Sequence, residues 1–226
     1  MKFQIKILIA ILFLSVFFLN KLVFAQNNSE ELLISWEALN YTPYDFYGKN
    51  LPSPGSTINV GFDFVQNGKI VDLSQNKIYW YINDNLVSND KGVKEISFIA
   101  PNLTERVVEI RIELPDFNVI KLIEIPIVKP RLIINAPFPK KEINMNEFEV
   151  SAIPYFFNLK KYDFDEININ WSINGIDALG KIEDPFVLPI KVLGNNQTII
   201  NIQAYAQNVN DESETALDEI NLIFKK

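Results

Sequence analysis

Hydrophobic and polar residues alternate along two stretches of the chain that closely resemble each other. The first covers residues 77–84 and the second covers residues 168–175. In each, large apolar side chains recur at every second position around a central tryptophan, a spacing typical of a half-buried β-strand. Each stretch then ends in an Asn-Asp or Asn-Gly pair, which favours a tight hairpin turn. The pattern predicts two equivalent strands and places Trp80 and Trp171 in the structural core.

These tryptophan strands are 91 residues apart and belong to a longer series of landmarks that recurs in the same order. The other pairs are 60–62 with 150–152 at a spacing of 90, 98–101 with 186–189 at 88, and 107–110 with 199–202 at 92. The pair at 98–101 and 186–189 is a shared Phe-x-x-Pro motif. Four landmarks at near-constant spacing indicate a tandem repeat.

Each repeat contains several short alternating runs that are separated by turn-forming residues. In the first repeat they are 32–38, 57–65, 70–73, 77–84, 94–99, 107–114 and 119–128, and in the second 131–135, 147–157, 168–175, 199–202 and 215–224. Short strands at this spacing are typical of an antiparallel sandwich. The predicted fold is all-β: two tandem antiparallel immunoglobulin-like β-sandwiches, residues 26–129 and 130–226, after an N-terminal signal peptide.

The first 25 residues differ from the rest of the chain. Lys2 and Lys6 precede a continuous apolar run at residues 7–19, and Val23 and Ala25 then occupy the two positions that a signal peptidase reads. The run is shorter than the roughly 20 residues that a membrane span needs. We expect a signal peptide at residues 1–25, cleaved after Ala25, with an uncleaved membrane anchor as the alternative. In either case the rest of the chain is exported to the periplasm, the cell surface or the medium.

Composition narrows the possible chemistry. The chain has no Cys and no His, which excludes disulfides, thiolate nucleophiles, zinc–thiolate sites and catalytic triads built on His. Three of the 21 basic residues lie in the first 25 positions, so 18 basic and 28 acidic residues remain after cleavage, a net charge of -10. Because an acidic domain repels phosphate groups, we expect no nucleic-acid partner, and membrane contact only through an uncleaved residues 1–25.

Residues 41–56 form a loop with three Pro, two Gly and four aromatic residues. Proline at this density prevents the segment from joining a sheet. Its aromatic residues, Tyr41, Tyr44, Phe46 and Tyr47, are a candidate binding surface for sugar rings or for a proline-rich segment of a partner. The alternative is that the loop folds back and covers the open edge between the sheets.

Acidic residues provide weaker candidates. The runs at 163–166 and 211–214 lack the spaced pattern of a calcium loop, so we expect solvated acidic loops and no metal site. Asp63 and Asp72 could act as an acid and a base, but nothing in the sequence brings them together, and we assign no catalytic residue. No cofactor is expected.

Strand edges are a further candidate interface. Pro126 marks the last strand of the first repeat as an edge or bulged strand. The strand at 215–224 could accept a strand from a partner, although Asp218, Glu219 and the terminal lysines could equally block such pairing.

The motif Trp-x-Ile-Asn followed by Asp or Gly, the downstream Phe-x-x-Pro and the closing alternating strand resemble bacterial immunoglobulin-like, PKD-like and fibronectin-III-like modules. The resemblance covers both repeats. Residues 34–38 and 44–56 are also similar to a signature in uncharacterised secreted envelope proteins of small-genome candidate-phylum bacteria. That resemblance implies an association with type IV pilus or cell-envelope gene clusters, and it implies no catalytic residues.

These observations favour a non-catalytic, exported structural or binding protein of the cell envelope, with a role as an accessory to a pilus or adhesion apparatus. The expected partner is an envelope protein or a polysaccharide. The alternative binding function is a carbohydrate-binding module that uses the aromatic residues of loop 41–56. A carboxylate-dependent glycosidase ranks last, because it requires two carboxyl groups about 5–10 Å apart in a cleft.

Overall fold

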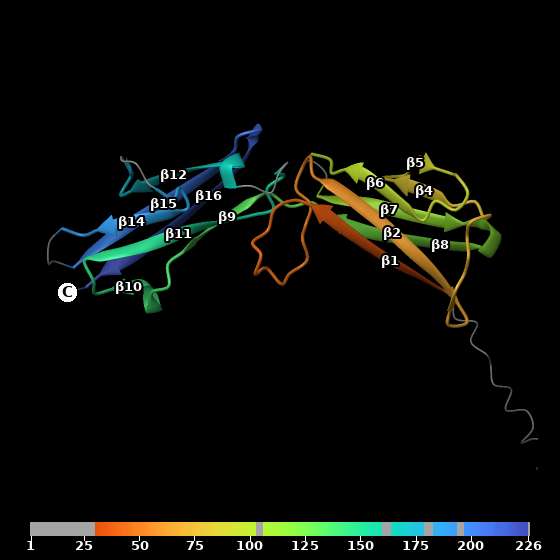
Figure 1. Ribbon diagram of the computed structural model, residues 1–226, viewed down its shortest axis with the longest axis horizontal. Coiled ribbons are helices and arrows are strands. Elements are labelled where there is room, and N and C mark those ends of the chain that lie inside the picture. The colour runs from red at the N-terminus through yellow and green to blue at the C-terminus, as the bar shows by residue number, and fades with distance from the viewer. Residues whose placement is uncertain (1–29, 103–105, 160–163, 179–182, 194–196, 226) are drawn as a thin grey trace, which may run out of the picture. The chain divides into compact units, whose positions relative to one another are not determined.

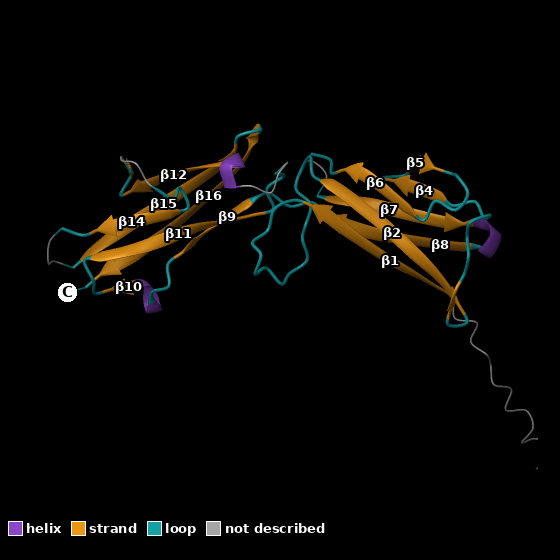
Figure 2. Ribbon diagram, viewed as in Figure 1, coloured by secondary structure: helices purple, strands orange, loops and turns teal. Residues whose placement is uncertain are grey.

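Strands make up nearly all of the regular structure (Figure 2). The computed structural model describes residues 30–102, 106–159, 164–178, 183–193 and 197–225. The predicted signal peptide at residues 1–25 lies outside these ranges. Within them the helical segments are 3₁₀ turns of three residues each, and none is long and apolar enough to cross a membrane. The turns are η1 (Pro115–Phe117), η2 (Pro139–Lys141) and η3 (Phe164–Glu166). The predicted all-β class is confirmed.

The first sandwich is built from two four-stranded sheets (Figure 1). One consists of β1 (Glu30–Leu39), β2 (Thr57–Gln66), β3 (Lys69–Ile70) and β6 (Glu95–Ile99). The other has the order β5-β4-β7-β8, with β4 at Tyr79–Ile82, β5 at Asn85–Ser88, β7 at Val107–Leu114 and β8 at Val119–Pro126. Every second residue of β7 is buried, as the alternating pattern predicts. Among the described strands, β8 pairs with β7 alone, so the strand that contains Pro126 is an edge strand.

The second sandwich has a three-stranded and a five-stranded sheet, in the orders β14-β11-β9 and β10-β16-β15-β12-β13. The smaller sheet contains β9 (Arg131–Asn135), β11 (Glu147–Tyr155) and β14 (Val187–Lys191). The larger contains β10 (Glu142–Ile143), β12 (Ile167–Ile173), β13 (Ile176–Asp177), β15 (Thr198–Asn208) and β16 (Asp211–Phe224). Strand β10 runs parallel to β16, whereas the other pairs are antiparallel. Trp171, Phe157, Ile202 and Phe224 lie in the core.

The two sandwiches repeat one strand order. Strands β1, β2 and β6 correspond to β9, β11 and β14, and strands β4, β5, β7 and β8 correspond to β12, β13, β15 and β16. Trp80 is fully buried and its Nε1–H donates to the Val93 carbonyl at 2.7 Å. Trp171 is 4% exposed and donates in the same way to the Pro185 carbonyl at 2.8 Å. Each tryptophan therefore has both its apolar ring and its polar edge satisfied within its own sandwich.

The predicted hairpin turns are present in both sandwiches. Asn83 and Asp84 have φ values of 47° and 61°, and Asn174 and Gly175 have 51° and 75°, the two left-handed residues that a type I′ turn requires. In both cases the asparagine side chain adds a bond, because Oδ1 accepts the backbone N–H of a residue on the neighbouring strand at 2.9 Å. These asparagines therefore attach the turn to the adjacent strand as well as forming it.

The prediction that the two Phe-x-x-Pro motifs occupy equivalent positions of the repeat was wrong. Val60 on β2 pairs with Ile96, and the matching Val150 on β11 pairs with Leu188, a spacing of 92 rather than 88. The two Phe-x-x-Pro motifs are thus displaced by four residues from each other. The proline of the second motif, Pro189, lies inside edge strand β14, where its missing N–H is tolerated, whereas the first proline follows the end of its strand.

Residues 34–63 and the chain from residue 72 onward cluster as one compact unit. Residues 30–33 and 64–71 belong to a second, smaller unit. Within the smaller unit, Val65 and Gln66 pair with Ile70 and Lys69 around an Asn-Gly turn, and Gln66 Nε2 donates to Glu30 Oε1 at 2.8 Å.

Candidate binding site

Two asparagines close the base of loop 41–56. Asn40 is only 2% exposed, and its Nδ2 donates to the Leu51 carbonyl at 2.7 Å. Asn50 Nδ2 donates to the carbonyls of Ala38 and Asn40 at 3.1 and 2.8 Å. These amides bond to the carbonyl groups of Ala38, Asn40 and Leu51. Residues 50 and 51 are therefore held close to the end of β1.

Phe46 fixes the tip of the loop. Its backbone N–H donates to the Pro43 carbonyl at 3.0 Å and closes a β-turn. Its ring meets the rings of Tyr155 and Phe156 edge to face, with centroid separations of 5.7 and 5.8 Å. Such a pair contributes about 0.5–1.5 kcal/mol beyond the burial of area. Gly48 also lies against the ring, where a Cβ would be 2.4 Å from Phe46 Cζ, so any other residue here would displace the ring.

Backbone hydrogen bonds join the start of the loop to the segment after β11. The Tyr41 N–H donates to the Phe157 carbonyl at 2.7 Å, and the Phe156 N–H donates to the Tyr41 carbonyl at 2.6 Å. Phe156 has a φ of 63°, a left-handed conformation that a bulky residue adopts only where its surroundings hold it. Burial is the main cause that raises the pKa of the Tyr41 phenol, so the hydroxyl stays protonated at neutral pH.

Glu214 is the buried carboxylate of this contact and is 7% exposed. Its Oε1 accepts the backbone N–H of Asn158 at 2.8 Å and the Ser53 hydroxyl at 3.3 Å, and its Oε2 accepts Asn208 Nδ2 at 2.6 Å. Burial raises the pKa of Glu214, although these three hydrogen bonds oppose the rise. The carboxylate joins loop 41–56, through Ser53, to strands β15 and β16.

The structure separates the four aromatic residues that the sequence grouped as a candidate surface. Tyr41 and Phe46 are half-buried and make the contacts described above. Tyr44 and Tyr47 are fully exposed, at 102% and 100% of their reference area. Because Phe46 and the two asparagines fix the loop around them, a partner would meet both exposed rings without first having to order the loop.

The polar residues that hold the loop were not found by sequence reasoning. Asn50 bonds to carbonyl groups just before the loop, and Asn40 bonds to the carbonyls of Leu51 and Phe156. Glu214 acts on Ser53, a residue 161 positions away. The only available signal was the position of Glu214 in its strand, which alternates in phase with the buried Ala216. A carboxylate at an inward position indicates a hydrogen-bonded polar contact rather than a solvated loop.

The other carboxylates considered from the sequence have local structural partners. Asp63 Oδ1 lies 2.7 Å from Lys94 Nζ. Asp72 accepts the Ser74 N–H at 2.9 Å, and the hydrogen bonds from Ser74 lower the pKa of that carboxyl group.

The acidic run at 211–214 is not the solvated loop that the sequence predicts, because it opens strand β16 and its Glu214 is buried. Asp211 accepts the backbone N–H and the hydroxyl of Ser213 at 3.0 and 2.6 Å, and these bonds lower its pKa. Asp163, in the other run, lies outside the described residues. Among the residues that are described, no group of three His, Cys, Asp or Glu side chains could hold a metal ion.

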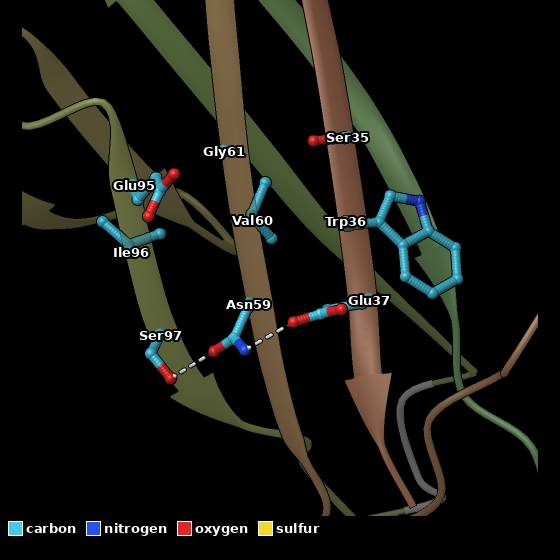
Figure 3. Close-up of a pocket in the computed structure, with 9 residues that line it drawn as sticks. All are labelled: Ser35, Trp36, Glu37, Asn59, Val60, Gly61, Glu95, Ile96 and Ser97. Carbon is cyan, nitrogen blue, oxygen red and sulfur yellow. Dashed lines mark hydrogen bonds between the residues drawn. The ribbon is translucent and has the colours of Figure 1, made fainter.

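A groove of about 400 Å³ crosses the outer face of β1, β2 and β6 (Figure 3). Asn59 lies at its centre, where Nδ2 donates to Glu37 Oε1 at 3.1 Å and Oδ1 accepts the Ser97 hydroxyl at 2.8 Å. Figure 3 shows the Trp36 ring on the other side of β1 from this polar row, and Lys49 Nζ lies 4.1 Å from the centre of that ring. The side chains of Glu37, Asn59 and Ser97 thus bond to one another across the groove.

No family model matches the chain, and no curated protein matches it. Among solved structures it is similar to the CbhA fibronectin(III)-like modules of Clostridium thermocellum, at 16% identity over 85% of this chain and 94% of that chain, with a TM-score of 0.30. It is similar to three N-terminal domains of the bacteriophage RB49 highly immunogenic outer capsid protein, at 10% identity over 87% and 59%, with a TM-score of 0.42. It is also similar to a C-terminal fragment of intimin, solved in complex with the intimin-binding domain of the translocated intimin receptor, at 10% identity over 85% and 63%, with a TM-score of 0.31. At these identities the likenesses concern the fold alone.

Proposed function

We propose that the protein is a non-catalytic, exported binding protein of the cell envelope, in which loop 41–56 contacts a partner protein. The observation that carries the proposal is the full exposure of Tyr44 and Tyr47 on a loop that Phe46 fixes in place. Tyrosine on a rigid support supplies contact area at a low entropic cost, which is why it is enriched at the centre of protein interfaces.

Export is part of the proposal and rests on the sequence of residues 1–25. The absence of Cys and His from the whole chain supports a non-catalytic role. The partner that we propose is an envelope protein of a pilus or adhesion apparatus. A carbohydrate-binding use of the same loop has less support, because Tyr41 and Phe46 pack against the protein and leave two rings rather than four for stacking.

The proposal is tested by capture from envelope fractions of the source cell, with residues 26–226 as bait. We expect one envelope protein to be captured by the wild-type bait and lost with the Tyr44→Ala/Tyr47→Ala double variant. Both side chains are fully exposed, so the fold should persist, as far-UV circular dichroism would check.

A matched control removes exposed apolar side chains elsewhere on the first sandwich. Leu86 and Ile120 are 49% and 66% exposed, and Leu86→Ala/Ile120→Ala should leave capture unchanged. The proposal fails if the tyrosine variant captures the protein as well as the wild type does, or if no envelope protein is captured. The double variant Tyr44→Phe/Tyr47→Phe shows whether the rings alone are sufficient.

A further inference from the structure

The outer face of the five-stranded sheet carries an unusual set of side chains. Its outward positions on β12, β15 and β16 include six amides: Asn168, Asn170, Asn201, Gln203, Gln207 and Asn221. We name this surface, together with Tyr205 among them, the amide face. Strands β12, β15 and β16 are the cyan to dark-blue strands of Figure 1.

The strand register arranges these side chains in rows across the sheet. Asn168 lies beside Gln207, and Asn170 lies beside Tyr205, which in turn lies beside Leu217. Neighbouring strands are about 4.8 Å apart, and successive same-face residues along a strand are about 6.7 Å apart. The result is a regular arrangement of mostly uncharged hydrogen-bonding groups with one aromatic ring between them.

Part of this arrangement is satisfied internally and part is free. On β12, β15 and β16 the charged residue of these rows is Glu219, whose carboxylate accepts Asn201 Nδ2 and Gln203 Nε2 at 2.5 and 3.1 Å. Asp177 of β13 lies beside Ser172 at the edge of the same row. Among the residues that the structure describes, the side chains of Asn168, Asn170 and Tyr205 form no hydrogen bond. Each free amide offers two donors and an acceptor that can serve a ligand.

The first sandwich shows that the fold does not require such a face. Aligning the tryptophan strands gives ten equivalent outward positions on the matching sheets. In the first sandwich four of the ten are charged, namely Glu109, Arg111, Glu113 and Glu124. In the second sandwich Glu219 alone is charged. In the second sandwich, Tyr205 lies at the position equivalent to Glu113, and Gln203 lies at the position equivalent to Arg111.

We propose that the amide face binds a neutral polysaccharide. Amides donate and accept hydrogen bonds at once, which matches neighbouring sugar hydroxyls, and a central tyrosine ring can stack on the apolar face of a sugar. None of the outward positions in the rows is basic, and the exported chain carries a net charge of -10, so anionic polysaccharides are repelled.

A protein partner fits this face poorly. The cores of protein interfaces are enriched in aromatic residues, methionine and arginine, around which water is excluded. Tyr205 and Leu217 are the large apolar side chains at the centre of the rows, Ile199 and Ile223 lie beside each other at one end, and most of the other outward positions carry amides or hydroxyls. A neutral glycan, by contrast, can use the amide groups directly and through bridging water.

The test is affinity electrophoresis of residues 26–226 in native gels that contain one polysaccharide each. The neutral probes are hydroxyethyl cellulose, dextran and galactomannan, and alginate is the anionic control. We expect at least one neutral probe to retard the wild-type protein and alginate to leave its mobility unchanged. Asn168→Ala/Asn170→Ala and Tyr205→Ala should each weaken retardation about ten-fold, the effect of losing one or two hydrogen bonds or a stacking contact.

Two controls separate this site from loop 41–56. Tyr79→Ala changes the position in the first sandwich that is equivalent to Asn170, and it should bind as the wild type does. Tyr44→Ala/Tyr47→Ala should also retain retardation, so loss of protein capture and loss of glycan binding can be scored independently. The inference is overturned if none of the three neutral probes retards the protein, if alginate retards it equally, or if the amide-face variants bind as the wild type does.

Discussion

Replacing Trp80 with phenylalanine tests how the first sandwich is stabilised. The Trp80 side chain is fully buried, its ring lies 5.5 Å from that of Phe62, and its Nε1–H donates to the Val93 carbonyl at 2.7 Å. Phenylalanine keeps most of the apolar contact but leaves that carbonyl without its donor. A carbonyl deprived of its donor costs about 1–3 kcal/mol, and because Val93 is half-buried we expect the lower part of that range, about 1–2 kcal/mol.

Trp80→Ala adds a cavity to the lost hydrogen bond, and we expect a loss of about 3–5 kcal/mol in the free energy of unfolding. The assay is urea denaturation of residues 26–226 followed by far-UV circular dichroism, since tryptophan fluorescence itself changes in the variants. Trp36→Phe is the control, because Trp36 is only half-buried, and we expect a change within about 0.5 kcal/mol. If Trp80→Phe and Trp36→Phe cost the same, the reasoning from burial and the hydrogen bond to Val93 is refuted.

Two further predictions concern Glu214 and the N-terminal segment. Because folding raises the pKa of Glu214, its contribution to stability is full below the ordinary pKa of a glutamate and is lost as the pH rises through the folded value. The free energy of unfolding of the wild type relative to Glu214→Gln should therefore fall between about pH 4 and pH 7, as urea titrations at both pH values would measure. A difference that stays constant or rises with pH contradicts this. For the N-terminal segment, the full chain expressed in a secreting bacterium should be exported and cleaved. The mass of the exported protein should correspond to a chain that starts at Gln26, and Ala25→Tyr should block cleavage. Recovery of the intact chain from the cytoplasm contradicts the prediction.

Strand positions were predictable where apolar and polar residues alternate without interruption. The strands at 107–114 and 131–135 have the observed bounds of β7 and β9. By contrast, the strand predicted at 199–202 extends over 198–208 as β15. Its inward residues beyond Ile202 include Ala204 and Ala206, which are fully buried but too small to produce a strong hydrophobic alternation. Burial of a small residue depends on what faces it, and that information is absent from the local sequence.

The candidate loop was predictable as a feature but not in its arrangement. Proline and aromatic density marked residues 41–56, yet which rings pack and which are exposed depends on Tyr155 and Phe156, far along the chain. One of these partners, Phe156, has a left-handed conformation, with a φ of 63°. No sequence pattern predicts a positive φ at a phenylalanine, since the conformation is imposed by the surrounding contacts.

The two sandwiches share the features that the fold itself requires and differ where the fold leaves a choice. Both have the buried tryptophan with its bonded Nε1–H and the left-handed turn whose asparagine accepts a backbone N–H from the next strand. These features lie at inward-facing strand positions and in the turns. The outward-facing strand positions do not pack in the core, so their side chains can vary with what the surface binds. At these ten outward positions the first sandwich carries four charged residues, whereas the second carries four amides and one charged residue, Glu219. This difference lies on a surface with no role in the core, and it is therefore the part of the repeat in which distinct binding functions are expected.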